Sequence, residues 1–253
     1  MIFKLSRINL KFDLIRRTES NRGTFYLKEY NMKRVIVDNL KMQNKEQNNE
    51  LVCKDKTGHY HPAFKKQGCL DGACATYSVI MNLLILGVIS EKDTHINAEH
   101  KTRDTRNLFK VFCNDYGMHR NGQTYYKITK MLKESFSTVV TPNHKLTSDS
   151  ESVELIKETI DGRIPIIISI GNKSDDWEHA MLAVGYEEND KGDVSKILCL
   201  DPGGDYVHGR KRWNAEIQIL PKQYRLSTVW RGLKTAKIVT LGDVIIITKN
   251  EVK

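Results

Sequence analysis

The sequence predicts an α+β fold in which a bulky helix from the N-terminal half packs against an antiparallel β-sheet. Helix patterns gather in the first half of the chain and strand patterns in the second, which is typical of α+β proteins and not of doubly wound sheets. Of the 253 residues, 40% are hydrophobic and 28% are charged, as in ordinary folded proteins. A chain of this length buries enough surface to fold without disulfides or metals.

The central helix is predicted over residues 72–87. Apolar side chains cover nearly every face between residues 79 and 86, which is typical of a buried helix, and Asp71 is a candidate N-cap. Amphipathic helices are predicted over residues 103–116, 122–136 and 150–160. Ser150 or Ser152 is the candidate cap of the last of them.

Apolar, largely β-branched runs bounded by Gly, Pro or Asp predict strands at residues 164–170, 179–186, 196–201 and 243–249. A weaker strand pattern covers residues 35–42. The polar stretch MQNKEQNN at residues 42–49 lacks apolar periodicity and predicts a loop or linker.

The chain carries 40 Lys and Arg against 31 Asp and Glu, a formal net charge of +9, and much of the excess lies near the N-terminus. Residues 1–40 hold nine basic and four acidic side chains. We expect residues 1–50 to form a basic N-terminal arm or subdomain and residues 51–253 to form the folded domain. The arm suits an acidic or nucleic-acid partner, although a solvated surface is the simpler interpretation. No zinc-finger, nucleotide-binding or RNA-binding signature accompanies the charge.

Export and membrane insertion are not predicted. The longest strongly apolar run, residues 78–89, has 12 residues, whereas a helix that crosses a bilayer needs ~20. Lys4, Arg7 and Lys11 interrupt the apolar start that a secretory signal needs. The five cysteines are an odd number and, without export, are expected to be reduced thiols. We therefore expect a cytoplasmic protein with no membrane partner.

Three segments carry the residue types of thiol-dependent catalysis: QGCLDGACATYS at residues 67–78, EHAMLAVGY at residues 178–186 and KILCLDPGG at residues 196–204. Cys74 stands where the apolar helix begins, and a helix N-terminus lowers the pKa of a thiol through its backbone N–H groups and partial positive charge. His179 begins a strand and supplies the base that a cysteine nucleophile needs. Asp201 ends the next strand, so its carboxylate can orient the imidazole if the two strands are neighbours.

These segments resemble the active-site motifs of papain-like cysteine peptidases. In that superfamily a glutamine precedes a Gly-small-Cys sequence that opens the central helix, and an aromatic residue and a serine follow, as in QGCLDGACATYS. HAMLAVGY is similar to the histidine strand of the superfamily. The aspartate as third member and the Gly-Arg-Ile-Pro-Ile-Ile-Ile run before the histidine look more like the bacterial double-glycine leader peptidases. The resemblance covers roughly residues 65–204.

Carried over residue by residue, the resemblance implies that Cys74 is the nucleophile and that His179 is the general base and later the general acid. It implies that Asp201 orients the imidazole. It further implies that Gln67 and the backbone N–H of Cys74 bind the oxyanion of the tetrahedral intermediate.

Two departures from the superfamily leave alternatives open. Ala75 stands where the superfamily has a tryptophan after the nucleophile, and the gap from Gln67 to Cys74 is one residue longer than in papain. An alignment on Asn82, as in the leader peptidases, puts Gly72 at the nucleophile position, and the protein is then an inactive relative or uses Cys69 in a shifted loop. Cys74 is preferred because it alone of the two cysteines stands at the helix start.

Cys53, His59, His61 and Cys69 invite comparison with a zinc site, but their spacing matches none of the common structural sites. We therefore expect no metal and no cofactor. Trp177, just before the histidine strand, either shields the base from water, lines the cleft or packs in the core.

We expect a cysteine peptidase that hydrolyses a peptide or isopeptide bond through a Cys-His-Asp triad and an acyl-enzyme intermediate, with a peptide or protein as substrate. Gly72, Ala73 and Ala75 favour a narrow cleft, which suits a glycine-containing substrate. The alternatives are an amidase or acyltransferase on the same scaffold and a catalytically silent module that binds a peptide or partner.

Overall fold

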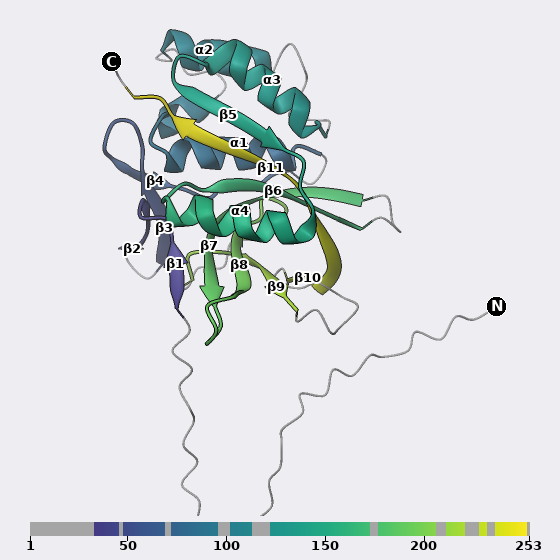
Figure 1. Cartoon of the computed structure of the whole chain (residues 1–253). Coiled ribbons are helices and arrows are strands. Elements are labelled where there is room, and N and C mark those ends of the chain that lie inside the picture. Colours follow the sequence, from purple (N-terminus) through teal and green to yellow (C-terminus); the bar gives the residue numbers. More distant parts are fainter. Residues whose placement is uncertain are drawn as a thin grey trace, which may run out of the picture. The chain divides into compact units, whose positions relative to one another are not determined.

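The computed structural model describes residues 33–45, 48–68, 72–95, 102–112, 122–172, 177–205, 211–220, 228–231 and 236–251 (Figure 1). The chain divides into two units, residues 1–30 and residues 31–253, and every described residue belongs to the second. Residues 1–32 of the predicted arm lie outside the described residues, so an acidic or nucleic-acid partner of the arm stays a prediction.

The described helices are α1 (Cys74–Ile85), the 3-10 helix η1 (Glu91–Thr94), α2 (Arg103–Lys110), α3 (Tyr125–Phe136) and α4 (Asp149–Asp161). α1 is buried on nearly all sides, as its apolar sequence predicts. In Figure 1, α2 and α3 lie together and α4 runs across the strands of the main sheet. Within the described ranges, none of the helices has both the length and the apolar character needed to cross a bilayer.

The main sheet contains β1 (Arg34–Ile36), β5 (Val140–Lys145), β6 (Ile166–Asn172), β7 (Trp177–Glu188), β8 (Val194–Leu200), β9 (Ala215–Ile219), β10 (Thr228–Arg231) and β11 (Ala236–Lys249). The order β7-β6-β11-β10-β9-β8 closes on itself, because β7 also pairs with β8. All of these pairings are antiparallel. β1 adds to β7 and β5 adds to β11. The long strand β7 is thereby held from both sides.

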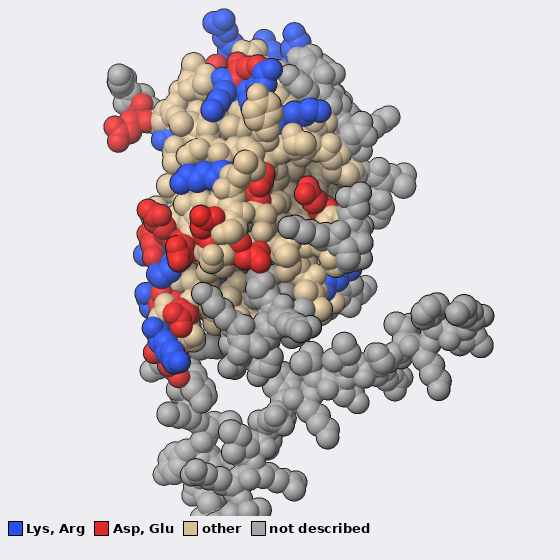
Figure 2. Space-filling view, turned by 45° about the vertical axis from the view of Figure 1, so that its right-hand side comes forward, with Lys and Arg blue, Asp and Glu red and all other residues tan. Residues whose placement is uncertain are grey.

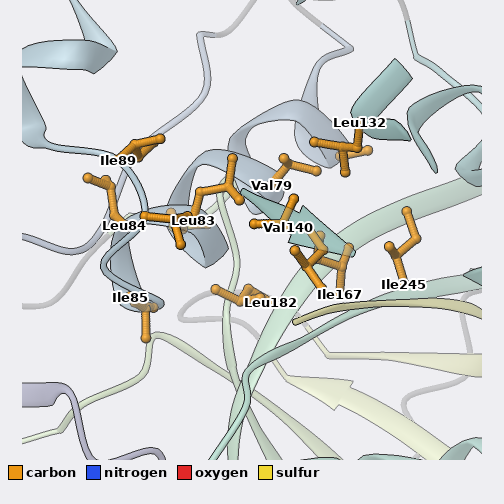
Figure 3. Close-up of a cluster of buried hydrophobic side chains, with 14 of the residues drawn as sticks. Val79, Leu83, Leu84, Ile85, Ile89, Leu132, Val140, Ile167, Leu182 and Ile245 are labelled. Carbon is orange, nitrogen blue, oxygen red and sulfur yellow. The ribbon is translucent and has the colours of Figure 1, made fainter. Parts of the chain in front are cut away.

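The two faces of the strands bury two different apolar cores. Ile167, Leu182 and Ile245 face the core that they share with α1, α2 and α3 (Figure 3). Ile168 and Met181, the next residues along their strands, face a second core shared with β8 and β9. This follows from the period of two in a β-strand, and it means that alternate residues of β7 face α1.

The predicted central helix and all four predicted strands are confirmed. α1 lies within residues 72–87, and the strands correspond to β6, β7, β8 and β11. α2 confirms the start of the helix predicted over residues 103–116, and part of the remainder lies outside the described residues. α3 and α4 confirm the other two helices. α4 is capped by Ser148, whose N–H and hydroxyl donate to Glu151, rather than by the later serines.

The loop predicted over residues 42–49 is wrong for most of its length. β2 (Leu40–Lys45) and β3 (Asn48–Lys54) pair antiparallel across this stretch, and β4 (Tyr60–Pro62) completes a small sheet. A strand needs apolar side chains only where other parts of the protein pack against it. In this hairpin Leu40 and Leu51, near its base, are such buried side chains. The polar outer part is held by backbone pairing, which leaves no apolar pattern in the sequence.

The boundary predicted at residue 50 falls inside the folded unit. β1 pairs with β7 in the main sheet, and the β2–β3 hairpin spans residue 50. The part of the predicted arm from Arg34 to Lys45 therefore belongs to the domain.

Candidate active site

The thiol of Cys74 lies at the first residue of α1, beside strand β7. The N-cap position is Ala73, which makes no side-chain cap, and the predicted cap Asp71 lies outside the described residues. Cys74 is half-buried, and its Sγ accepts a hydrogen bond from the backbone N–H of Ala180 at 3.4 Å. The first helical residue therefore presents its thiol to β7.

A second contact, one helical turn further on, sets the register between α1 and β7. The buried hydroxyl of Ser78 donates to the backbone carbonyl of Ala180 at 3.5 Å. Cys74 and Ser78 are four residues apart and share one face of the helix. Ala180 thus contacts this face through both its N–H and its C=O, which holds the neighbouring His179 at the start of α1.

His179 of β7 and Asp201, which follows β8, lie side by side at the ends of neighbouring strands. Nε2 of His179 and Oδ1 of Asp201 are 2.7 Å apart. The His179 ring also lies close enough to the Cys74 side chain for each to shift the pKa of the other. Since Nε2 meets the carboxylate, Nδ1 is the ring nitrogen that faces the thiol. The three predicted residues therefore form one chain of contacts.

These contacts shift the pKa values of Cys74 and His179 in opposite directions. Burial raises the pKa of the Cys74 thiol, but the hydrogen bond and charge of His179 and two backbone N–H groups lower it below the ordinary 9.0. Burial lowers the pKa of His179, but Asp201 and Cys74 raise it to about 9. Both shifts favour the thiolate–imidazolium pair, in which the sulfur is nucleophilic.

A buried hydrogen-bond network holds Asp201, which is only 2% exposed. Its Oδ1 accepts the backbone N–H of Gly203 at 2.8 Å. The buried side chain of Asn214 accepts from the Asp201 N–H at 2.7 Å and donates to the Asp201 carbonyl at 2.8 Å. A Cβ at position 203 would lie 3.3 Å from both Asp201 Oδ1 and His179 Cε1, so the glycine permits the close approach of this turn.

Two indole rings cover the imidazole. The ring of Trp177 stacks on His179 with centroids 5.9 Å apart and an interplanar angle of 17°. Trp230 lies 5.9 Å from His179 at 41°, and the two indoles are 5.7 Å apart. Exclusion of water from the imidazole strengthens its hydrogen bond to Asp201.

A cleft of about 520 Å³ opens beside this group. Cys74, His179 and Ala180 line it together with residues 122–125 at the start of α3. Its volume is in the range of sites that bind ligands. The thiol therefore lies at the wall of a cavity and is not packed in hydrocarbon.

The sequence matches the model of the Peptidase_C39 like family over residues 39–237. The chain belongs to this family. The described residues form the α+β fold predicted from the sequence. No curated protein matches the sequence. The crystal structure of UfSP from C. elegans is similar to 87% of the chain at 14% identity and a TM-score of 0.42, and the chain spans 38% of that structure's length.

Two other cysteines of this Peptidase_C39 like protein lie in environments that suppress reactivity. Burial, and then the charge of Asp55, raises the pKa of Cys53 to about 12. Burial, followed by the charge of Asp201, raises the pKa of Cys199 well above 9. Cys69, the alternative nucleophile, lies outside the described residues, and so does Cys113.

Gln67 lies beside the turn that follows Asp201, because its backbone N–H donates to the carbonyl of Pro202 at 2.9 Å. The segment before α1 is thereby tied to the carboxylate end of the site. An oxyanion contact of the Gln67 side chain stays a prediction.

The alternative alignment concerns Asn82 and Gly72. Asn82 is fully buried and donates to the carbonyl of Pro165 at 2.9 Å, which ties α1 to the residues before β6. Gly72 lines the same cleft as Cys74 but precedes the helix. The thiol in contact with the imidazole is that of Cys74.

The residues compared with a zinc site have other partners. Nε2 of His61 lies 3.1 Å from the Asp55 carboxylate, and Cys53 is buried in the α1 core. In the described part of the chain, no three His, Cys, Asp or Glu side chains are grouped as metal ligands would be.

Sequence reasoning missed Ser78, Asn214 and Trp230. Ser78 carried a usable signal, because it is a small polar residue one turn after Cys74 on the same face of the helix. Asn214 precedes β9 and Trp230 lies in β10, and neither strand was predicted. Their proximity to the site arises only when the ring of strands closes.

Proposed function

We propose that the protein hydrolyses peptide or isopeptide bonds by attack of the Cys74 thiolate, with His179 as proton carrier and Asp201 as the residue that orients it. One observation carries the proposal: a half-buried thiol at a helix start and a neighbouring imidazole line one cleft, and a buried carboxylate lies 2.7 Å from Nε2 of that imidazole. The peptidase family accounts for the class of reaction, and this arrangement supports the choice of residues.

The first half-reaction starts from the thiolate–imidazolium pair. The Cys74 sulfur bonds to the carbonyl carbon, and the π electrons of the carbonyl move to its oxygen. The C–N bond then breaks as the Nδ1 proton of His179 passes to the leaving amine. The products are a free amine and a thioester on Cys74.

The second half-reaction consumes one water. Neutral His179 takes a proton from the water as its oxygen bonds to the thioester carbonyl carbon. The C–S bond breaks, the carboxylic acid leaves, and the thiolate–imidazolium pair is restored. Asp201 accepts the Nε2–H hydrogen bond throughout, which keeps Nδ1 directed at the reacting atoms.

Oxyanion stabilisation is assigned to the start of α1 and to Gln67. The first N–H groups of a helix have no partner within the helix, and Ala73 supplies no side-chain cap. The Cys74 N–H is therefore a suitable donor to the oxyanion. Gln67 is the candidate second donor because its backbone contact with Pro202 keeps it beside the Asp201 turn.

Alkylation with iodoacetamide, followed by peptide mass mapping, tests the nucleophile. We expect Cys74 to react fastest at pH 7, because its pKa is lowered, and peptidase activity to fall in proportion to its modification. Cys53 and Cys199 are internal controls, because burial raises the pKa of each. Fast modification of Cys69 with Cys74 left unmodified would identify Cys69 as the nucleophile. A protein without any fast-reacting thiol would be a silent binding module.

A further inference from the structure

A second hollow of about 560 Å³ adjoins the cleft beside Cys74. The two cavities share Ser169, Glu178 and Gly242, and together they are called the groove. A Cβ at Gly242 would overlap with the Ser169 hydroxyl, so a side chain is excluded at this position, where the two cavities adjoin. The volumes of the two cavities leave space for several substrate residues next to the thiol.

A β-bulge in β11 forms one wall of the groove. The pairing of β11 with β6 shifts register between Leu241 and Val244, so Gly242 and Asp243 together lie opposite Ser169. A β-bulge changes the direction in which the neighbouring side chains point, and bulges are frequent next to functional sites. Asp243 thereby lines the cleft, where its carboxylate also lies 2.8 Å from Nε2 of His144.

The groove is acidic although the chain has a net charge of +9. Asp149, Glu178 and Asp243 line it, and its described lining includes no Lys or Arg. Glu178 is exposed, precedes His179 and lines both cavities of the groove. The rest of the surface is also unevenly charged. On the face shown in Figure 2, many of the basic side chains lie near the top.

The carboxylates of this groove differ in their existing partners. Asp149 already accepts the backbone N–H of Leu241 at 2.6 Å. Asp243 contacts the His144 imidazole, which is cationic only when protonated. Glu178 forms no ion pair within the described part of the chain. Glu178 is therefore the carboxylate most available to an incoming cation, and Asp243 is the nearest to share it.

Tyr125 is an independent sign that the cleft takes a ligand. It lines the cleft and is only 7% exposed, and its hydroxyl has no hydrogen-bond partner among the described residues. Buried polar groups are almost always hydrogen-bonded, so an acceptor is missing here. Burial, and then the charges of Cys74, Asp243 and Glu178, raises the pKa of Tyr125 well above 10, so the hydroxyl remains a donor. All three of these charged groups line the cleft, which locates the phenol at its wall.

We propose that the groove selects substrates with a Lys or Arg side chain within two residues of the scissile bond. Glu178 and Asp243 contact the cation, and the Tyr125 hydroxyl donates to a backbone carbonyl of the substrate. The inference rests on the proposed function, because it takes the Cys74 cleft as the place of cleavage. It adds a substrate class and three residues that determine specificity.

A degenerate octapeptide mixture with blocked ends tests the inference through two readouts. Mass spectrometry maps the bonds that the wild-type protein cleaves, and it also identifies the peptides retained by immobilised Cys74→Ala protein, which needs no catalysis. We expect Lys and Arg to be enriched about fivefold to tenfold in both sets, as for a charge pair in a partly buried cleft.

Variants separate recognition of the cation from general damage. Glu178→Gln and Asp243→Asn should each reduce the enrichment of Lys and Arg, and Glu178→Lys should replace it with enrichment of Asp and Glu. Glu158→Gln, on the exposed side of α4, changes the net charge equally and should leave the preference intact. Tyr125→Phe should weaken retention of all peptides alike, because its hydroxyl meets the backbone.

The outcomes distinguish this inference from the proposed function. Cleavage without a preference for Lys or Arg, or a Glu178→Lys protein that still prefers them, would overturn the inference and leave the peptidase assignment standing. Selective retention of basic peptides that the wild-type protein never cleaves would contradict the proposed reaction and support the groove. Absence of selective retention together with absence of cleavage would overturn both.

Discussion

The two ends of α1 have opposite environments within one helix of 12 residues. At the start, Cys74 is half-buried, borders the cleft and meets His179. In the second half, Leu83 and Leu84 are fully buried and pack in the core drawn in Figure 3. The first end carries the groups suited to chemistry, and the second end anchors them to the domain.

The difference shows that position along an element, and not residue type, decides what a side chain can do. The start of a helix leaves N–H groups without intrahelical partners and carries a partial positive charge. Cys199, a thiol of the same kind within a buried strand, has its pKa raised where that of Cys74 is lowered. Replacements at the two ends of α1 should therefore have separable effects on activity and on stability.

Replacement of the thiol at the first end should give the largest effect. We expect Cys74→Ala to reduce kcat/KM by about 10⁴-fold or more, because loss of a nucleophile leaves only binding and oxyanion contacts. Thermal unfolding should change little, since the side chain is only half-buried. Cys199→Ala is the matched control and should cost ~1–2 kcal/mol of unfolding free energy while retaining activity. Equal losses of activity in the two variants would contradict the comparison.

Truncation at the second end should destabilise the protein without altering its chemistry. Leu83→Ala should reduce the free energy of unfolding by ~2–5 kcal/mol, because a fully buried leucine leaves a cavity. Denaturant titration measures this loss, and the kcat of the protein that remains folded should equal that of the wild type. Leu146→Ala, at a leucine that is 79% exposed, is the control and should be near neutral.

The pH dependence of activity should reflect the titration of the groups at the start of α1. Acylation needs the Cys74 thiolate and the His179 imidazolium together. Activity should therefore rise with pH through the lowered pKa of Cys74 and fall again as pH rises past the His179 pKa of about 9. Above that point kcat/KM should decrease about tenfold per pH unit. A profile that still rises at pH 10 would exclude the imidazolium as the acid.

The smallest effect should come from Ser78, which lies between the two ends. Ser78→Ala removes the hydroxyl contact with Ala180 and should cost ~0.5–1.5 kcal/mol of unfolding free energy. If the contact also positions β7, the rate of Cys74 alkylation at pH 7 should fall as well, and a purely structural role would leave that rate unchanged. Ser78→Thr keeps a hydroxyl and is expected to restore the rate more than Ser78→Ala.

Local patterns explain which parts of the fold were predictable. α1 and the four strands β6, β7, β8 and β11 have continuous apolar sequences, and each was predicted within a few residues of its ends apart from the longer β11. β5 escaped prediction because it contains Pro142 and lies at the edge of the sheet, where it pairs with β11 alone. The β2–β3 hairpin escaped because its outer half is polar on both faces.

The sequence by itself determined that an apolar helix begins at Cys74, that a strand carries His179 and that Asp201 comes at the end of the next strand, because these features are properties of short, continuous segments. Only the tertiary structure decided that Nδ1 of the imidazole faces the thiol, that Asn214 and Trp230 support the site, and that Glu178, Asp243 and Tyr125 line one groove. The physical reason is distance along the chain. The Cys74–Ala180 contact joins residues 106 positions apart, and no local pattern encodes the geometry or the electric field that such contacts create.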